Sequence, residues 1–272
     1  SMKKKEKKKN NKKNIIIVLI GVIILVIIVV IIFMFKSKSL NPESDDIIKI
    51  YNYLGTNDLD ICNGLYAYDE NEVNYDTLDN KWRICNAYNN LNVGEETVIK
   101  IDKTKKDNNC SVGENITFAT DNYNSDVCTI SKVSSEEVNS EYKKIYGRDI
   151  ENYETFDYND TTICYYEDDY YYCGLKESYT TTIGAEPSTY RSIQKAVQND
   201  DEIIIYDYFL KVVNNECLTS FTGNTKNDEC STDYNEDTKI NYSYLKKYGT
   251  RYKHTFKKSG DDYYWVKSEP SS

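Results

Sequence analysis

Histidine and proline are nearly absent from this chain of 272 residues, which contains one histidine and three prolines. A single histidine excludes any metal site built from histidines alone. Basic side chains are also in the minority, and a formal net charge of −10 argues against general nucleic-acid binding. The apolar share of 39% is low for a protein with many membrane spans, but it is sufficient for a folded domain.

Charge is distributed unevenly along the chain. Residues 1–14 carry eight lysines and one glutamate, whereas residues 15–35 carry no charged side chain. Residues 36–272 hold 26 basic and 43 acidic side chains, which is a net charge of −17. The chain therefore divides into a basic tail, an apolar segment and an acidic, tyrosine-rich body.

The apolar segment 15–35 predicts a transmembrane helix. Its 21 residues would form a helix about 31 Å long, which matches the hydrocarbon core of a bilayer. No small-residue cleavage site follows the segment, because Phe35 is followed directly by Lys36. We therefore expect a retained signal anchor rather than a cleaved signal peptide.

The lysines predict the orientation of this span. Eight lysines precede it, and only Lys36 and Lys38 follow it closely. The positive-inside rule then places the N-terminal tail in the cytoplasm and the C-terminal body outside the cell, in a single-pass protein of the cell membrane. Binding of anionic lipid or nucleic acid is another role for such a tail, but setting the topology is enough to explain it.

The cysteines point to the same compartment. All eight lie in the body, and an even number of cysteines outside the cytoplasm predicts disulfides. They are Cys62, Cys85, Cys110, Cys128, Cys164, Cys173, Cys217 and Cys230. A hairpin turn at Asp168-Asp169 would place Cys164 directly opposite Cys173, near enough for a bridge. Sequential pairing then suggests the bridges 217–230, 62–85 and 110–128.

Zinc is the alternative use of these cysteines. The closest pair, Cys164 and Cys173, is nine residues apart, and the chain has no CxxC motif. Tetrathiolate zinc sites normally need tighter pairs. We therefore expect no metal and no cofactor.

Helices are predicted mainly in the first half of the body. Asn41-Pro42 is typical of a helix start, and Gly55 of a helix end. Apolar residues recur at helical spacing over 76–91, where Leu78, Trp82, Cys85 and Tyr88 share a face. Ser134 and Glu137 form a capping-box pattern ahead of a helix that stops at Gly147. A short helix is expected at 242–248.

Strands are predicted mainly after Thr161. A short strand is expected at 96–102, and residues 103–126 are polar and turn-rich. The predicted hairpins pair the strands around Cys164 and Cys173, then 190–198 with 202–213, then 251–257 with 262–267. The β-branched and aromatic run of 202–213 is typical of a central strand. Residues 214–238 read as a polar insertion.

These elements predict an α+β extracytoplasmic domain of helices packed on a curved antiparallel sheet and stapled by disulfides. The element order is similar to that of NTF2-like or cystatin-like cones, which is an analogy of order alone. A division into residues 41–126 and 127–267 is possible. No proline- or glycine-rich linker separates these two parts, which favours one interlocked domain.

Catalytic motifs are weak. The pattern S-x-x-K occurs at Ser140, Ser192 and Ser243, but the accompanying elements are in the wrong order. His254 lies mid-strand between Tyr252 and Phe256, where a packed and hydrogen-bonded histidine is more typical than a triad member. The stretch that begins at Asp233 resembles an EF-hand loop but lacks its glycine and final glutamate.

Tyrosine is the most abundant aromatic residue, at 27 copies. Tyrosine rings suit recognition surfaces, and the clusters on the hairpins alternate across strand faces. The candidate binding residues are Tyr165, Tyr166, Tyr170, Tyr171, Tyr172, Tyr263 and Trp265. The competing explanation is codon bias, because asparagine, lysine and isoleucine are also abundant, as an AT-rich genome produces.

The most economical function is a non-catalytic, membrane-anchored binding or interaction module. It would bind a protein, a peptide or a wall polymer through the tyrosine-rich hairpins. The alternative is a cell-envelope hydrolase that uses acidic cleft residues or His254, and a third possibility is a structural subunit. An enzyme should show a pocket with converging carboxylates or His254, whereas a binder should show an exposed aromatic patch.

Overall fold

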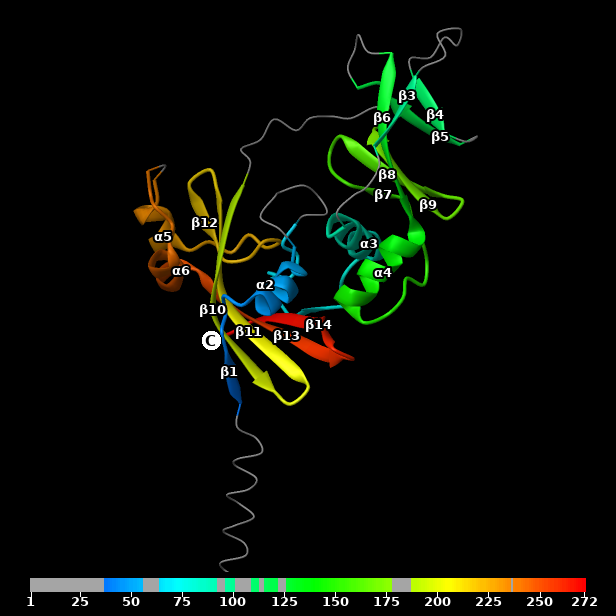
Figure 1. The fold of residues 1–272 in the computed structure, drawn as a ribbon. Coiled ribbons are helices and arrows are strands. Elements are labelled where there is room, and N and C mark those ends of the chain that lie inside the picture. Colours follow the sequence, from blue (N-terminus) through cyan, green and yellow to red (C-terminus); the bar gives the residue numbers. More distant parts are fainter. Residues whose placement is uncertain are drawn as a thin grey trace, which may run out of the picture.

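The protein is described by a computed structural model that is mixed α+β and dominated by sheets (Figure 1). The structure describes residues 37–55, 64–91, 96–100, 109–112, 115–121, 126–177, 187–235 and 237–272. The predicted basic tail 1–14 and span 15–35 lie outside these ranges. Within them, no helix is long and apolar enough to cross a membrane.

The larger sheet is antiparallel throughout. Its order is β1 (Lys38–Leu40), β10 (Ser188–Asn199), β11 (Glu202–Val213), β13 (Thr250–Ser259), β14 (Asp262–Pro270) and β2 (Val73–Asn74), with β12 (Glu216–Leu218) also on β11. The run of β-branched and aromatic residues in β11 is paired on both sides, as predicted for a central strand. The hairpin of β10 and β11 turns at Asp200, whose φ is 48°.

The smaller sheet has the order β3 (Glu96–Lys100), β6 (Val127–Ser134), β9 (Tyr170–Leu175), β8 (Thr162–Glu167) and β7 (Phe156–Asp157). Asp168 and Asp169 turn the β8–β9 hairpin with φ values of 48° and 65°. Two consecutive left-handed residues match the twist of the paired strands. Cys164 therefore lies opposite Cys173 in the register, and the two are bridged, as predicted.

Five helices occur in the described residues: α2 (Asp45–Asn52), α3 (Asn80–Asn89), α4 (Ser135–Tyr146), α5 (Asp228–Asp233) and α6 (Tyr242–Tyr248). The capping box of α4 is confirmed, with Ser134 as N-cap and Glu137 at the third position. Gly147 ends α4 with a φ of 71°, a conformation that costs glycine little.

The main core lies where α3 and α4 pack between β14 of the larger sheet and one face of the smaller sheet (Figure 1). Tyr142 and Tyr146 of α4 are buried there, and Tyr146 makes an edge contact with Trp265 of β14. Tyr171 closes the other side from β9. The helices thus join the two sheets through one continuous cluster of buried residues.

Several sequence expectations for the first half of the body are corrected. Strands are not confined to the region after Thr161. The turn-rich segment 103–126 contains the hairpin of β4 (Asn109–Val112) and β5 (Ile116–Ala119), and β6 follows it. β4 and β5 are only four residues each, and β5 and β6 alternate between buried and less buried positions once their partners are in place. The helices at 41–55 and 76–91 are shorter than predicted, because they begin after N-caps at Ser44 and Asp79.

Two further bridges match sequential pairing: Cys110–Cys128 and Cys217–Cys230. Cys85 is also disulfide-bonded, while Cys62, its predicted partner, lies outside the described residues. Strand pairing crosses the possible domain boundary after residue 126, because β3 pairs with β6 and β2 pairs with β14.

Candidate functional site

A pocket of about 430 Å³ opens beside the N-terminus of α3. That volume falls within the range of small-ligand sites. Its lining comes from the segment before α3, from α3 itself and from β7. The lining residues are Tyr66, Thr77, Leu78, Asp79, Lys81, Trp82, Cys85, Phe156 and Asp157.

The cap of α3 positions the pocket residues. The Asp79 carboxylate accepts hydrogen bonds from the backbone N–H groups of Lys81, at 2.8 Å, and of Trp82, at 3.4 Å. This cap fixes the first turn of the helix and hence the Trp82 side chain. Buried Arg83 donates to the carbonyl oxygen of Leu78 at 2.8 Å, which holds the approach to the helix in place.

Aromatic rings form the floor of the pocket. The Tyr66 ring makes an edge contact with Trp82, with ring centres 5.1 Å apart, and another with Phe221 at 5.5 Å. Phe156 is buried beside them. Burial raises the pKa of Tyr66, so its hydroxyl is protonated at neutral pH.

Polar groups line the rim. Asp79, Lys81 and Asp157 are all exposed, and Asp157 pairs with Lys176 at 3.0 Å. The Nε1 of Trp82 is different, because it is buried and has no hydrogen-bond partner among the described residues. A buried indole N–H without an acceptor is costly. The site therefore combines an aromatic lining with rings set edge to face, a mixed-charge rim and one buried donor without a partner among the described residues.

The sequence prediction of an exposed aromatic face is wrong for two of its members. Tyr171 is fully buried, and Trp265 is 4% exposed. Both belong to the main core. Their strands alternate as predicted, but the inward positions face the core, where Trp265 contacts Tyr146 of α4 and Tyr171 contacts Phe156 of β7.

Among the remaining predicted residues, Tyr165, Tyr170 and Tyr172 share one face of the β8–β9 hairpin, because Tyr165 lies opposite Tyr172 and the rings of Tyr170 and Tyr172 are 6.3 Å apart. Tyr166 lies on the other face of this hairpin, opposite Tyr171. Tyr165 packs against Phe118 at 5.5 Å, and Tyr166 stacks on Tyr153 at 4.9 Å. Tyr170 is 37% exposed. The Nζ of Lys132 lies 3.8 Å from the centre of the Tyr170 ring and 5.5 Å from that of the Tyr172 ring.

Tyr263 lies on the larger sheet, apart from the other predicted tyrosines. Its hydroxyl accepts a hydrogen bond from Gln198 at 3.1 Å. It lines a second pocket of about 470 Å³ between β1, α2 and the starts of β11 and β14. The exposed ion pair of Lys49 and Asp262, at 2.7 Å, also borders this pocket.

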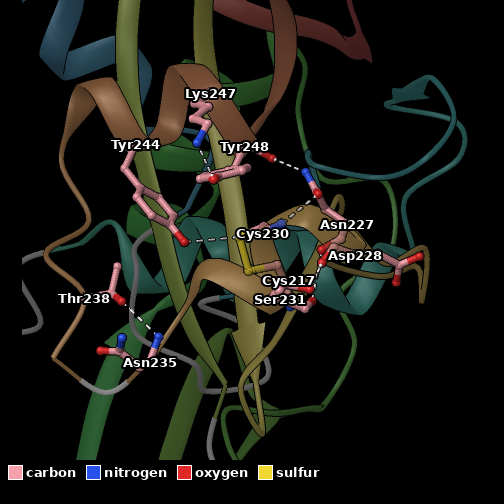
Figure 2. The surroundings of a disulfide bond; sticks show 11 residues. Cys217, Asn227, Asp228, Cys230, Ser231, Asn235, Thr238, Tyr244, Lys247 and Tyr248 are labelled. Carbon is pink, nitrogen blue, oxygen red and sulfur yellow. Dashed lines mark hydrogen bonds between the residues drawn. A yellow bond between two sulfur atoms is a disulfide. The ribbon is translucent and has the colours of Figure 1, made fainter.

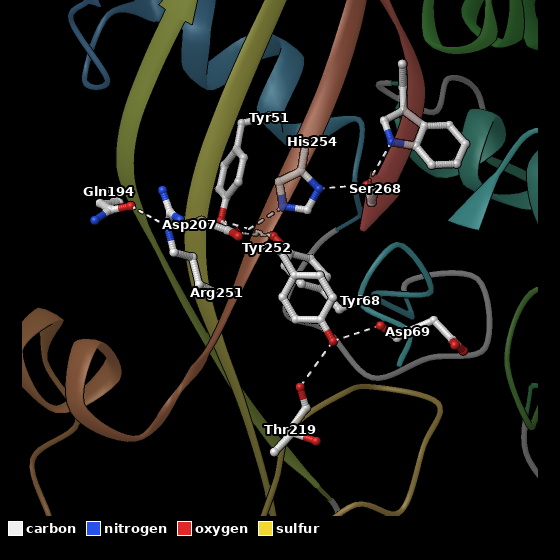
Figure 3. A network of polar contacts seen from close by, with 11 residues as sticks. Tyr51, Tyr68, Asp69, Gln194, Asp207, Thr219, Arg251, Tyr252, His254 and Ser268 are labelled. Atoms are coloured by element: carbon white, nitrogen blue, oxygen red, sulfur yellow. Dashed lines mark hydrogen bonds and ion pairs between the residues drawn. The ribbon is translucent and has the colours of Figure 1, made fainter. Parts of the chain in front are cut away.

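His254 is part of a buried polar network (Figure 3). Its Nε2 lies 3.0 Å from Asp207 Oδ1, and its Nδ1 lies 2.6 Å from Ser268 Oγ. Trp265 Nε1 donates to the same Ser268 oxygen at 2.9 Å. The Asp207 carboxylate can only accept, so in a neutral imidazole Nε2 is the donor, and Nδ1 accepts from the Ser268 hydroxyl while the Ser268 oxygen accepts from the indole. His254 then carries its proton on Nε2 and donates it to Asp207.

Two tyrosines complete this network. Tyr51 donates to Asp207 Oδ2 at 2.5 Å, and Tyr68 donates to the same oxygen. Burial, and then the charge of Asp207, raise the pKa of both phenols well above the usual value, which keeps them protonated as donors. Arg191 lies over the Tyr51 ring at 4.4 Å and brings a positive charge toward the carboxylate.

The Asp207, His254 and Ser268 contacts resemble those of a hydrolytic triad, but the three side chains have no exposed surface. A nucleophile must reach its substrate, and neither of the pockets described above is lined by these residues. The sequence interpretation of His254 as a packed, hydrogen-bonded residue is confirmed.

The Cys217–Cys230 bridge joins β12 to α5 (Figure 2). The side chain of Asn227 caps α5 by accepting from the N–H of Cys230 at 3.0 Å, and it donates to the carbonyl oxygen of Tyr248 at 2.9 Å. Cys217 donates from its N–H to Ser231 Oγ at 2.9 Å. This part of the predicted polar insertion is a small structural unit. No cluster suited to a metal occurs among the residues described.

The pocket beside α3 was not found by sequence reasoning. Trp82 shares the helical repeat of Cys85 and Tyr88, so its spacing indicates a core position. The usable signal was the cap at Asp79, which begins the helix at Asn80 and leaves Trp82 in its first turn. Comparison of the chain with protein-family models, curated proteins and solved structures finds no match.

Proposed function

We propose that this chain is a single-pass membrane protein whose body lies outside the cell and binds a ligand without catalysis, through the pocket beside α3. The apolar segment 15–35 and the lysines before it support the anchor and its orientation. The bridges at Cys110–Cys128, Cys164–Cys173 and Cys217–Cys230 support an oxidising compartment.

The aromatic floor of the pocket carries the binding proposal. Tyr66, Trp82 and Phe156 offer apolar ring surface at a mouth lined by charged groups. Binding sites for small molecules and polymer ends share this combination of an apolar floor with a few polar groups. The ligand is a protein, a peptide or a wall polymer met at the cell surface. The tyrosines of the β8–β9 hairpin are a secondary candidate face.

The carboxylates at the pocket favour binding over hydrolysis. Asp79 caps α3, and Asp157 pairs with Lys176. Both are exposed to solvent. A general acid for hydrolysis works from an apolar, water-excluded environment, whereas these two carboxylates lie in solvent and already bind the α3 cap and Lys176. A cell-envelope hydrolase is therefore the second choice. The likeness to NTF2-like or cystatin-like cones stays a prediction on which no part of the function rests.

Cosedimentation tests this function. The full-length chain in detergent is mixed with washed cell envelopes from the expressing cells, and the bound fraction is measured. We expect Trp82→Ala to lower binding by about tenfold, since buried aromatic anchors dominate interfaces. Tyr170→Ala removes an exposed ring from the β8–β9 hairpin, which is the secondary candidate face and does not line the pocket, and it should bind normally. Loss in the Tyr170 variant alone would move the site to the hairpin, and no binding by the unaltered chain would refute the function.

A further inference from the structure

The charged side chains at the rim of the α3 pocket restrict which ligand charges the pocket can accept. Asp79 and Asp157 bring two negative charges, and Lys81 brings one positive charge. The body around them is also strongly acidic, at −17. An anionic polymer would meet repulsion at this mouth. A neutral ligand that offers hydroxyl donors to the two carboxylates suits the rim.

The aromatic rings that line the pocket restrict the shape of the ligand. The Tyr66 and Trp82 rings meet edge to face at 5.1 Å, and the buried Phe156 lies in the same lining. Aromatic side chains give large apolar contact area with a defined geometry. A pyranose ring matches this arrangement, because its C–H groups form an apolar face while its hydroxyls point outward from the ring edge. The volume of about 430 Å³ has room for such a ring.

The indole N–H of Trp82, which has no acceptor among the described residues, indicates which functional group the ligand should carry. The Nε1–H of Trp82 is buried without a partner among the described residues. A ligand that supplies an acceptor there removes the cost of that unpaired group. An amide carbonyl is a strong acceptor, and an acetamido group joins it to a methyl that suits the apolar surface of Leu78 and Phe156.

Building on the proposed function, we propose that the pocket binds an N-acetylated amino-sugar unit of a neutral glycan. The sugar ring packs against the aromatic floor, and its acetamido carbonyl accepts from Trp82 Nε1 once a rotation of the Trp82 side chain brings this buried atom to the pocket surface. Its hydroxyls donate to Asp79 and Asp157 at the rim. No bond is made or broken in this step, so the protein acts as a lectin-like receptor at this site.

Calorimetry with defined sugars tests this assignment. The full-length chain in detergent is titrated with a trimer of N-acetylglucosamine and with the glucose trimer of the same linkage. We expect the acetylated trimer to bind about tenfold more tightly, because only it pairs the buried indole donor. Trp82→Phe keeps an aromatic ring but removes the N–H. This variant should lose the preference and bind the two trimers with about equal affinity. Tyr242→Ala, which removes an exposed ring of α6 that does not line the pocket, should leave both affinities unchanged.

Tryptophan fluorescence provides a second readout. The chain has two tryptophans, and Trp265 is buried in the core, so a sugar in the pocket should change the emission of Trp82. The emission of Trp265 then reports whether the Trp82→Phe variant is folded.

Each contrary result has a distinct meaning. Equal affinity for the two trimers would overturn the acetamido contact and leave a general sugar site. Failure of both trimers to bind would overturn the glycan assignment. Trp82-dependent binding of a lysine-rich peptide in their place would assign the acidic rim to a basic peptide. The envelope cosedimentation is independent of all three results, so it separates failure of this inference from failure of the proposed function.

Discussion

Asp207 and His254 meet in the interior of the protein, with Asp207 Oδ1 3.0 Å from His254 Nε2 and no exposed surface on either side chain. Asp207 on β11 and His254 on β13 are diagonal neighbours on the same face of the sheet. Asp207 pairs with Tyr252, and His254, two residues further along β13, pairs with Ile205. The sheet thus carries a carboxylate and an imidazole into an aromatic core, where each has hydrogen-bond partners. A buried charge with this many partners is a structural element whose loss is costly.

Replacing the buried carboxylate should destabilise the fold strongly. In Asp207→Asn, the amide nitrogen presents N–H groups toward partners that are themselves donors, so at least one is left unpaired. We expect the free energy of unfolding to fall by about 3–5 kcal/mol, as for broken buried pairs. Asp262→Asn at the exposed Lys49 pair is the control and should cost less than about 1 kcal/mol. Urea denaturation without reductant measures both, and similar losses would contradict the assigned role.

Any side chain at Gly147, which ends α4, should destabilise the fold. This glycine has a φ of 71°, and a Cβ there would lie 2.7 Å from the Tyr264 ring. Gly147→Ala therefore combines backbone strain with a clash, and we expect a loss of about 2–4 kcal/mol. Gly260 has a φ of 63° with open space around it. Gly260→Ala thus isolates the strain of about 1 kcal/mol. Thermal unfolding should separate the two variants.

The buried tyrosines should make the protein sensitive to alkali. Burial raises the pKa of Tyr88 from 10.0 to about 12. A raised pKa means that the folded state holds the phenol proton more tightly than the unfolded chain. This contribution to stability is complete below pH 10 and is lost as the pH rises through about 12.

A spectroscopic titration checks this expectation. The tyrosinate absorbance should rise in two stages, first from exposed tyrosines and later from buried ones together with unfolding. Circular dichroism should lose its native signal only in the second stage. A single stage centred near pH 10, with the fold retained, would show that the phenols such as Tyr88 are accessible.

The predicted bridge between Cys62 and Cys85 can be tested by non-reducing peptide mapping. Cys85 is disulfide-bonded in the structure, and the described cysteines include no free thiol. We expect one linked peptide that contains Cys62 and Cys85, together with the other three bridges. A Cys85 peptide linked to any other cysteine would overturn sequential pairing. Free thiols at most positions would contradict the extracellular assignment.

The predicted topology can be tested on intact cells with added protease. The body should be removed, because it lies outside, while the lysine-rich residues 1–14 remain protected. A fluorescent label on the N-terminus and an antibody to the C-terminal strand would follow the two parts. Protection of the body with loss of the tail would reverse the orientation that the lysines predict.

Sequence reasoning succeeded where the determining interactions are local. The Ser134 and Glu137 pair lies within one helical turn, so it predicts the start of α4. Two adjacent aspartates turn the β8–β9 hairpin, and the bridge of Cys164 to Cys173 follows from that turn. The helix at 242–248 has the bounds predicted, because Asn241 caps it and Gly249 follows it.

Sequence reasoning failed where partners come from distant parts of the chain. β6 is a strand because it pairs with β3 and β9, and nothing in residues 127–134 alone requires those partners. Tyr171 and Trp265 alternate correctly along their strands, but the main core covers the faces on which they lie. A pattern of alternation shows that two faces exist, whereas only packing shows which face is covered.

Trp82 and His254 show most clearly which features follow from local sequence and which depend on the tertiary structure. Local spacing predicts Trp82 on a helix and His254 on the same strand face as Tyr252. In the structure Trp82 lies in α3, and His254 and Tyr252 lie two residues apart in β13. The pocket beside Trp82 and the carboxylate beside His254 come from segments far along the chain, because only folding brings Phe156 to α3 and Asp207 to β13. Helix caps and tight turns act over a few residues, while a binding site and a buried charge network depend on contacts that close long loops.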